Sequence, residues 1–314
     1  MRTPLLSPNR RVRPPAIARA DDPEPGDNLR GAGLMVMCMT LFTLNDTVIK
    51  FVTQELPLYQ AMTLRGAVVM VLLLVLAQRK GGLDLRVTPA DRWPLALRTI
   101  GEVGSTLLFV NALTMMPIGD LSAIMQSLPL LVMLGAALVF GERLGWRRLM
   151  AVCVGLVGVL MILRPGSAAF GLASILGLAS VLLVVLRDLS TRVFARSLKS
   201  ETIAFYAACA VTGTSLVMSL GQGWQSVSLS LALLLILGGT FLTGGYLTAV
   251  ASMRVGEISY VAPFRYVSLV VAIILGLVVF GEWPDGWTWA GSALVVAAGI
   301  YSIWREAQLR QGAG

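Results

Sequence analysis

The chain contains ten apolar segments, each about as long as a helix must be to cross a lipid bilayer. A helix needs roughly 20 apolar residues to span about 30 Å of hydrocarbon. Hydrophobic residues make up 56% of the 314 residues and charged residues only 13%, whereas soluble domains carry about 25% charged residues. The segments do not alternate as barrel strands do, so helices are expected. We predict an all-α integral membrane protein with ten transmembrane helices at about 31–52, 58–78, 94–115, 119–139, 146–163, 170–187, 202–220, 229–252, 257–280 and 287–304.

The distribution of basic residues predicts how these helices are oriented. Cytoplasmic loops of membrane proteins carry an excess of Lys and Arg. With a cytoplasmic N-terminus, 20 of these residues fall on the cytoplasmic side and one, Arg164, on the outer side. Both termini are therefore predicted to be cytoplasmic, in a multi-pass protein of the plasma membrane, which is the inner membrane in a Gram-negative bacterium. Residues 1–30 are predicted to form a disordered tail, not a signal peptide, and residues 305–314 a second cytoplasmic tail.

The two halves of the chain resemble each other. VFGERLGW at 139–146 is similar to VFGEWPDGW at 279–287, and TMMPIGD at 114–120 to SMRVGE at 252–257. This spacing predicts two units of five helices, 31–163 and 170–304. Because five is odd, the second unit has inverted topology, an arrangement that underlies many secondary transporters. The alternative is a duplication that only built a large helical bundle.

These features together resemble the EamA type of the drug/metabolite transporter superfamily, over about residues 31–304. LNDTVIKF at 44–51 and SYVAPFRYVSLVVAIILGLVVFGEWPD at 259–285 are similar to members associated with uptake of S-adenosylmethionine or riboflavin. The APFRY run looks closer to the S-adenosylmethionine branch. The resemblance implies a carrier that moves a small organic solute, similar to S-adenosylmethionine, riboflavin or an amino acid, without ATP hydrolysis. Export of amino acids or drugs, or a non-transporting lipid-handling scaffold, are the alternatives.

Five ionisable residues within the predicted spans are candidates for solute binding or gating. A charge at the bilayer centre costs about 2.5–3.5 kcal/mol on insertion scales, so each needs a reason. Asp46, Lys50 and Arg65 are expected at an outer depth, and Glu102 and Arg265 at an inner depth. This arrangement suits two gates or two ends of one cavity, with a Glu102–Arg265 pair at the inner end.

Four of these charges also have a local explanation, and for Arg65 it is a pair with Asp46 or an extension of its side chain to the interface. Asp46 stands one helical turn before Lys50 and can neutralise it, and Glu102 stands one turn after Arg98. The acid–base spacing of LNDTVIKF recurs in the second half, as LRDLSTRV at 186–193. The recurrence fits a symmetric gate or helix-end anchor better than a solute site for Asp46 and Lys50.

Arg265 is the strongest candidate for contact with the solute. It follows Pro263, which frees backbone groups, and it stands between Phe264 and Tyr266, whose rings can stack on a planar solute. A guanidinium suits a carboxylate or phosphate through two parallel hydrogen bonds.

Prolines in two corresponding segments predict helix breaks. Pro129 lies in the fourth apolar segment and Pro263 in the ninth, and broken helices near the midplane are familiar transporter sites. Gln126 and Ser127 precede Pro129 by about one turn and offer uncharged hydrogen bonds to a solute. Proline kinks without a function are the alternative.

The sequence argues against enzymatic chemistry. The chain has no histidine, which removes Ser-His catalysis, HExxH metalloproteases and the commonest proton shuttle. Its three cysteines show no metal-binding spacing, and no Walker A loop is present. No catalytic residue, metal or cofactor is expected. The expected partners are a small organic solute, the bilayer, and protons or a counter-solute; no nucleic acid is expected, and a homodimer is left open.

Overall fold

The structure is a computed structural model that describes residues 25–79, 82, 85–141, 145–165, 171–192, 200–255 and 258–311. Within these ranges it contains helices and no strand. In chain order the elements are α1 (Pro25–Val52), α2 (Leu58–Arg79), η1 (Pro89–Asp91), α3 (Arg92–Met115), α4 (Ile118–Met125), α5 (Leu128–Phe140), α6 (Trp146–Leu163), α7 (Leu172–Arg192), α8 (Ser200–Ser219), α9 (Leu229–Val255), α10 (Ile258–Val261), η2 (Ala262–Tyr266), α11 (Val267–Leu275), η3 (Gly276–Phe280) and α12 (Gly286–Gln311).

The expected all-helical class is confirmed for this part of the chain. Eight helical stretches are long and apolar enough to cross a membrane, and the apolar helix Leu149–Leu163 is shorter. Every segment that we predicted to span the bilayer is mainly helical where the structure describes it, and the fourth is interrupted by a turn at Gln126 and Ser127. Helix α1 begins at Pro25, inside the tail predicted for residues 1–30, whereas residues 1–24 and 312–314 and Glu142 of the first FGE motif lie outside the described residues.

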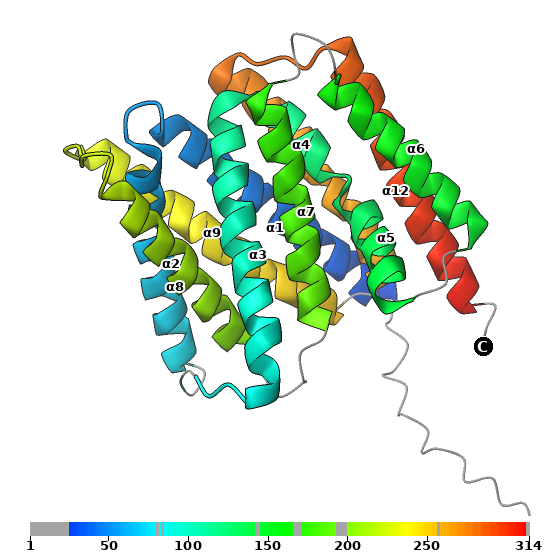
Figure 1. Cartoon of the computed structure of the whole chain (residues 1–314), viewed down its shortest axis with the longest axis horizontal. Coiled ribbons are helices and arrows are strands. Elements are labelled where there is room, and N and C mark those ends of the chain that lie inside the picture. The colour runs from blue at the N-terminus through cyan, green and yellow to red at the C-terminus, as the bar shows by residue number, and fades with distance from the viewer. Residues whose placement is uncertain are drawn as a thin grey trace, which may run out of the picture.

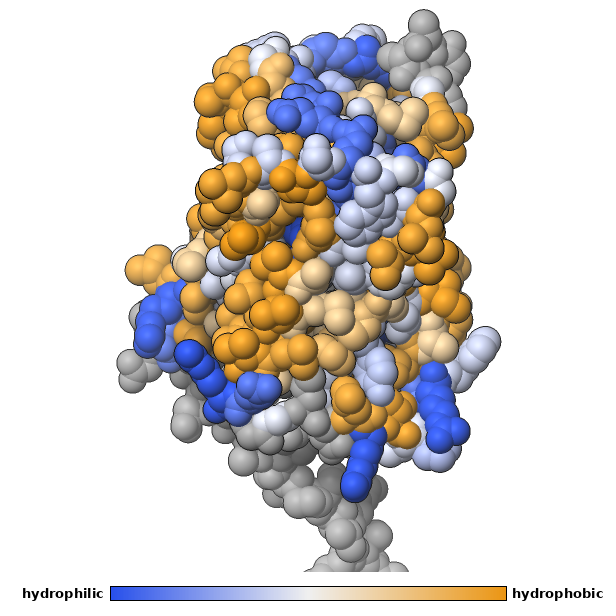
Figure 2. All heavy atoms as spheres, turned by 90° about the vertical axis from the view of Figure 1, so that its left-hand side faces the viewer, coloured by the Kyte–Doolittle hydropathy of each residue, from blue (hydrophilic) through white to orange (hydrophobic). Residues whose placement is uncertain are grey.

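Apolar side chains face outward from this bundle. Leu138 is 78% exposed and Val278 is 74% exposed, and Figure 2 shows hydrophobic residues over the middle of one face with hydrophilic residues toward its ends. Polar side chains such as Gln60, Ser180 and Ser215 are fully buried. This distribution is the one expected when lipid, and not water, surrounds the helices.

The helices pack in long pairs from opposite halves of the chain. Helix α1 packs along α9, α3 along α7, α2 along α8, and α6 along α12. Figure 1 shows α2 and α8 at one side of the bundle and α6 and α12 at the other, with the remaining helices between them. Two large apolar clusters fill the interior, one around α4, α5, α7 and α11 and one around α1, α2 and α3.

Small residues allow the α6–α12 pair to approach closely. A Cβ atom built on Gly158 would lie 2.7 Å from the carbonyl oxygen of Gly291, and one built on Gly291 would lie 2.5 Å from that of Gly158. Small residues at such crossings let two membrane helices bring their backbones together.

Both proline-containing segments are broken helices. Helix α4 ends at Met125 and α5 starts at Leu128, with Pro129 in its first turn. Pro263 lies in the 3₁₀ segment η2, between α10 and α11. The second segment then ends in the π-helical turn η3, and Gly281 follows it with a left-handed φ of 68°. Gly141 of the first FGE motif has a φ of 66°, so the two motifs end their helices in the same way.

Candidate functional site

A cavity of about 870 Å³ lies between the two halves of the bundle. Its walls come from α1, α2, α3, α4, α5, α7, α8, α9, η2 and α11, and they include four arginines and three carboxylates. Its size lies within the range of about 300–1,000 Å³ that is usual for small-molecule pockets. Because this many charges in a membrane protein are expensive, the cavity is the candidate functional site.

On one side of the cavity, beside the lining residue Ile118, the two halves are joined by a contact that we call the Lys50–Glu282 bridge. The Nζ atom of Lys50 donates to Oε1 of Glu282 at 2.5 Å and to the carbonyl oxygen of Met116 at 2.8 Å. The second carboxylate oxygen of Glu282 accepts from the backbone N–H of Ile118 at 3.0 Å. The Lys50 ammonium also lies 5.0 Å from the centre of the Phe280 ring, within cation–π range.

The backbone around Glu282 explains how this carboxylate reaches α1. The π-helical turn η3 adds a residue to the last turn, and the left-handed Gly281 then reverses the chain, so that the N–H of Glu282 donates to the carbonyl oxygen of Gly276 at 2.9 Å. Such π-helical turns often occur at functional sites. The sequence suggested Asp46 as the neutralising partner of Lys50, and the structure gives Lys50 a partner from the opposite half instead.

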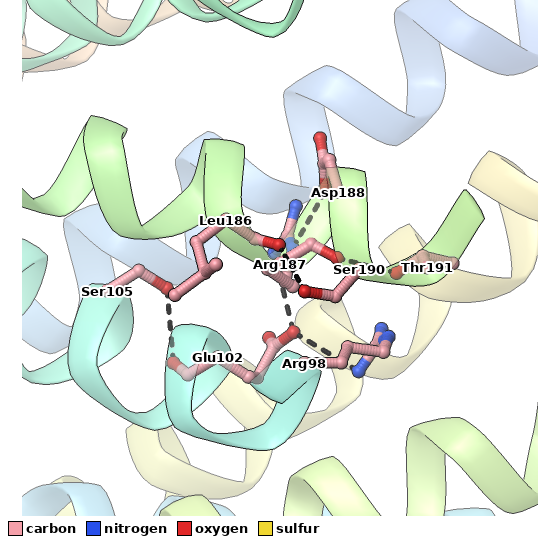
Figure 3. A network of polar contacts seen from close by, with 8 residues as sticks. All are labelled: Arg98, Glu102, Ser105, Leu186, Arg187, Asp188, Ser190 and Thr191. Carbon is pink, nitrogen blue, oxygen red and sulfur yellow. Dashed lines mark hydrogen bonds and ion pairs between the residues drawn. The ribbon is translucent and has the colours of Figure 1, made fainter. Parts of the chain in front are cut away.

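Elsewhere in the cavity wall, α3 and α7 are joined by the α3–α7 network of Arg98, Glu102, Arg187 and Asp188 (Figure 3). Oε2 of Glu102 lies 3.6 Å from Nη1 of Arg98 and 3.4 Å from Nη1 of Arg187. Nε of Arg187 donates to Oδ1 of Asp188 at 2.9 Å. Glu102 is buried, whereas Thr191, which also lines the cavity, is exposed, so the cavity reaches an exposed rim on α7.

A second polar cluster lies in the cavity wall on α1 and α2, and we call it the Asn45 triad. Nη1 of Arg65 donates to Oδ1 of Asn45 at 2.9 Å, and Nδ2 of Asn45 donates to Oδ1 of Asp46 at 3.0 Å. Asn45 therefore connects a cation and an anion that the sequence predicted to be close. Nε of Arg65 is buried without a hydrogen-bond partner among the described residues.

Arg265 also lines the cavity, and Gln126 lies nearby. Nε2 of Gln126 donates to the hydroxyl of Ser268 at 2.6 Å, and this hydroxyl donates to the carbonyl oxygen of Arg265 at 3.0 Å. The two broken helices therefore meet at this point of the wall, where Pro129 also lies. The expected Glu102–Arg265 pair is not among the ion pairs of the described residues, because Glu102 is engaged by Arg98 and Arg187.

Several predicted site residues are outside the described cavity lining: Lys50, which forms the bridge, Pro263, and the three residues Tyr266, Phe264 and Ser127. Tyr266 is buried against α12, where the absence of a side chain at Gly299 makes room for its ring. Phe264 packs against Tyr260, with ring centres 6.0 Å apart. Ser127 is fully buried and donates to the carbonyl oxygen of Ile124 at 2.7 Å. None of the three is in the described cavity lining.

The aromatic side chains that do line the cavity are Phe42, Phe109 and Tyr246. Nothing in the sequence distinguishes these rings from core residues. The recurrence of the acid–base spacing did point to Asp188, whereas Arg187 beside it carried no comparable signal. No group of three or more His, Cys, Asp or Glu residues that could hold a metal is found in the described part of the chain.

Comparisons with known proteins agree with this architecture. Residues 29–164 match the model of the EamA-like transporter family. A riboflavin transporter of Rhizobium johnstonii is 28% identical over 90% of this chain and 94% of its own length. An S-adenosylmethionine uptake transporter of Rickettsia prowazekii is 25% identical over 62% of this chain and 66% of its own length.

Two further similarities are to an exporter and to a solved structure. A pseudopaline exporter of Pseudomonas aeruginosa is 26% identical over 86% of this chain and 94% of its own length. A solved crystal structure with 21% identity superposes with a TM-score of 0.62 over 87% of this chain and 97% of the other, which shows a shared fold. The resemblance stated from the sequence is thus confirmed: this multi-pass membrane protein carries, in residues 29–164, a unit that matches the model of the EamA-like transporter family.

Proposed function

We propose that the protein is a secondary transporter that carries a small organic metabolite across the plasma membrane by alternating access. The observation that carries the proposal is a charged cavity between the two halves, with the Lys50–Glu282 bridge joining the halves beside its wall. A carrier needs such a site, and it needs contacts between halves that can form on one side and open on the other. The function requires no catalytic residue, and it makes the chain a non-enzyme.

The proposed topology is ten membrane-spanning segments in two inverted repeats, 31–163 and 170–304, with both termini cytoplasmic. The helix pairs support it. An approximate twofold axis that exchanges the repeats converts the α1–α9 pair into the α7–α3 pair, and it maps α2–α8 and α6–α12 onto themselves. The matching left-handed glycines, Gly141 and Gly281, support the same relation.

This topology assigns a side to each end of the cavity. The Lys50–Glu282 bridge then lies at the external side and Thr191 at the cytoplasmic side, since the predicted cytoplasmic segments, which hold most Lys and Arg, include the residues at the end of α7. The structure would accordingly represent a state that is closed to the outside and faces the cytoplasm.

The proposed solutes are compounds similar to riboflavin, S-adenosylmethionine or an amino acid. The riboflavin and S-adenosylmethionine transporters among the relatives support this range. The three cavity carboxylates offer sites for coupled protons, and exchange against a second solute is the other source of energy. Export in place of uptake is favoured by one observation, the similarity to the pseudopaline exporter; the same cavity serves both directions, and solute gradients decide between them.

Transport by purified protein in liposomes tests this function. We expect saturable, ATP-independent uptake of at least one of radiolabelled riboflavin, S-adenosylmethionine or an amino acid. Ala208→Trp places a large ring in the cavity wall and should abolish uptake, whereas Val278→Trp, on the 74% exposed outer surface, should not. Uptake equal to that of protein-free liposomes for all these solutes would contradict the proposal and favour a scaffold.

A further inference from the structure

The charges that line the cavity do not balance. Four arginines face three carboxylates: Arg65, Arg98, Arg187 and Arg265 against Asp46, Glu102 and Asp188. The α3–α7 network uses two of each, and the Asn45 triad uses one of each. Among the described residues, this leaves Arg265 as the cavity cation without an ion-pair partner. An unneutralised guanidinium in a site of low dielectric attracts an anion strongly.

Hydrogen bonds hold the main chain of Arg265 at the junction of the two broken helices. Residues Ala262–Tyr266 form a 3₁₀ segment between α10 and α11, and the Ser268 hydroxyl donates to the carbonyl oxygen of Arg265 at 3.0 Å. Ser268 in turn accepts from Gln126 across the cavity wall at 2.6 Å. Arg265 therefore comes from the broken helix of one half and is tied to the broken helix of the other. A solute that binds at this junction therefore contacts a residue that is linked to both halves.

The rest of the wall is suited to an organic body attached to that anion. Phe42, Phe109 and Tyr246 line the same cavity, and Phe42 and Tyr246 pack edge to face with ring centres 5.5 Å apart. Aromatic walls favour planar, partly apolar groups. Small inorganic anions would use Arg265 and leave this aromatic surface empty.

We propose that Arg265 is the anion-binding residue of the solute site, and that the transported solute carries a carboxylate or a phosphate that this guanidinium binds. The inference rests on the proposed transport function and narrows it to organic anions and zwitterions. Two parallel N–H···O bonds from a guanidinium match either oxyacid. The other three arginines remain with their carboxylates when the solute binds.

Binding of matched ligand pairs to the purified full-length protein tests the proposal. S-adenosylmethionine and its decarboxylated form differ only in the carboxylate, and riboflavin 5′-phosphate differs from riboflavin only in the phosphate. We expect the acidic member of at least one pair to bind about tenfold more tightly, measured by calorimetry and by the shift in Tm. Inorganic phosphate, as a fifth probe, tests whether a free anion binds without the organic body.

Substitution of the arginine identifies the binding group. Arg265→Gln should make both members of the preferred pair bind equally within about twofold, and Arg265→Lys should keep part of the preference. Arg147→Gln, which removes an exposed arginine on α6, is the matched control and should keep all of it. The comparison of ligand pairs with the wild-type protein needs no variant, so it remains decisive if Arg265→Gln does not fold.

Three binding results would each contradict the proposal that Arg265 binds an anionic group of the solute. They are a preference below about twofold in both pairs, a preference that survives Arg265→Gln, or no binding of any anion, phosphate included. Stabilisation by phosphate alone, unchanged in Arg265→Gln, would show an adventitious ion only and would also overturn it. Saturable uptake of riboflavin that Arg265→Gln leaves unchanged would overturn the anion site while the transport function stands, whereas no uptake of any solute would contradict transport itself.

Discussion

Lys50 shows how a charged residue is retained in a membrane-spanning helix. An ammonium needs its charge neutralised and its N–H groups paired when water is absent. Glu282 provides the charge and Met116 a carbonyl oxygen, while Ile118 donates to the far side of the same carboxylate. The backbone groups fix the polarity of the bridge, because a carbonyl faces the cation and an N–H faces the anion.

Neutralising one member of the Lys50–Glu282 bridge should be worse than neutralising both. The side chains are 9% and 24% exposed, so each single change, Lys50→Met or Glu282→Gln, should lower the free energy of unfolding by about 2 kcal/mol, less than for a fully buried pair. The double substitution should lower it by less than the sum. The exchange Lys50→Glu with Glu282→Lys should not restore stability, because the backbone groups then oppose the new charges.

The Arg164–Asp285 ion pair provides the control for the bridge. Its side chains are 26% and 47% exposed, and exposed pairs contribute about 0–1 kcal/mol. Asp285→Asn also keeps an oxygen to accept the N–H of Thr288 at the start of α12. Denaturation in detergent should therefore show little change for Asp285→Asn. Additive losses at Lys50 and Glu282 would show that the two residues are not coupled.

Glu102 should be coupled to Arg187 and not to Arg265. Glu102→Gln leaves the Arg98 and Arg187 guanidiniums without their shared carboxylate, so a second change, Arg187→Gln, should recover about 1 kcal/mol of the loss. Arg265→Gln should recover none of it. Double-mutant cycles on thermal stability measure both couplings, and a coupling of Glu102 to Arg265 alone would restore the pairing expected from sequence.

At the residue scale, the sequence identified several charged residues that line the cavity, but it did not identify their partners. Hydropathy identifies a charge within an apolar run, and this placed Asp46, Arg65, Glu102 and Arg265 in or near one cavity. Partners depend on how helices rotate against one another. Spacing along the chain therefore suggested Asp46 for Lys50, whereas the actual partner is 232 residues away.

At the scale of the elements, long apolar runs bounded by charges predicted the helices well. Prolines marked where α4 meets α5 and where η2 interrupts the ninth segment. The π-helical turn η3 had no comparable signal, because its residues, GLVVF, are ordinary in an apolar helical segment. Its consequence is large, since this turn directs Glu282 toward Lys50.

The α6–α12 pair should be sensitive to a single methyl group. Gly158→Ala or Gly291→Ala would place a Cβ atom against backbone on the facing helix, and the separation of the helices should lower the free energy of unfolding by about 1–3 kcal/mol. Gly213→Ala on α8 is the control, because a Cβ atom added there would meet no atom of a neighbouring helix within 4 Å. It should be neutral or stabilising by up to about 1 kcal/mol.

Measurements of solute binding distinguish a loss of stability in these glycine variants from a change in the solute site. The α6–α12 pair lies at the side of the bundle and contributes none of the described cavity residues. Both glycine variants should therefore melt earlier but keep the wild-type Kd for any ligand that the protein binds. A changed Kd with an unchanged Tm would mean that this helix pair acts on the cavity and not on packing.

For the whole molecule, the packing of helices of one half against helices of the other gives the proposed transport cycle its physical basis. Each long pair joins the first half to the second, so a rotation of one half against the other slides these pairs without breaking either half apart. The Lys50–Glu282 bridge then has to open whenever the cavity faces outward, because it joins α1 to the end of η3 across the two halves.

Labelling of single cysteines with a membrane-impermeant maleimide tests both the orientation and this opening. In a background without Cys38, Cys153 and Cys209, the exposed Thr191→Cys should react only from the cytoplasmic side, and the exposed Gln222→Cys, in the loop between α8 and α9, only from outside. Met62 lines the cavity and is 1% exposed, so Met62→Cys should react slowly from outside.

Opening the bridge should change the labelling rate of Met62→Cys and leave that of Gln222→Cys unchanged. Adding Lys50→Met removes the ammonium that holds Glu282, so the outward-facing state gains population and external labelling of Met62→Cys should rise about tenfold, which corresponds to a shift of about 1.4 kcal/mol. Labelling of Gln222→Cys should not change. External labelling of Thr191→Cys in the otherwise unaltered protein would contradict the proposed orientation. If Lys50→Met leaves the labelling rate of Met62→Cys unchanged, the bridge does not close the cavity.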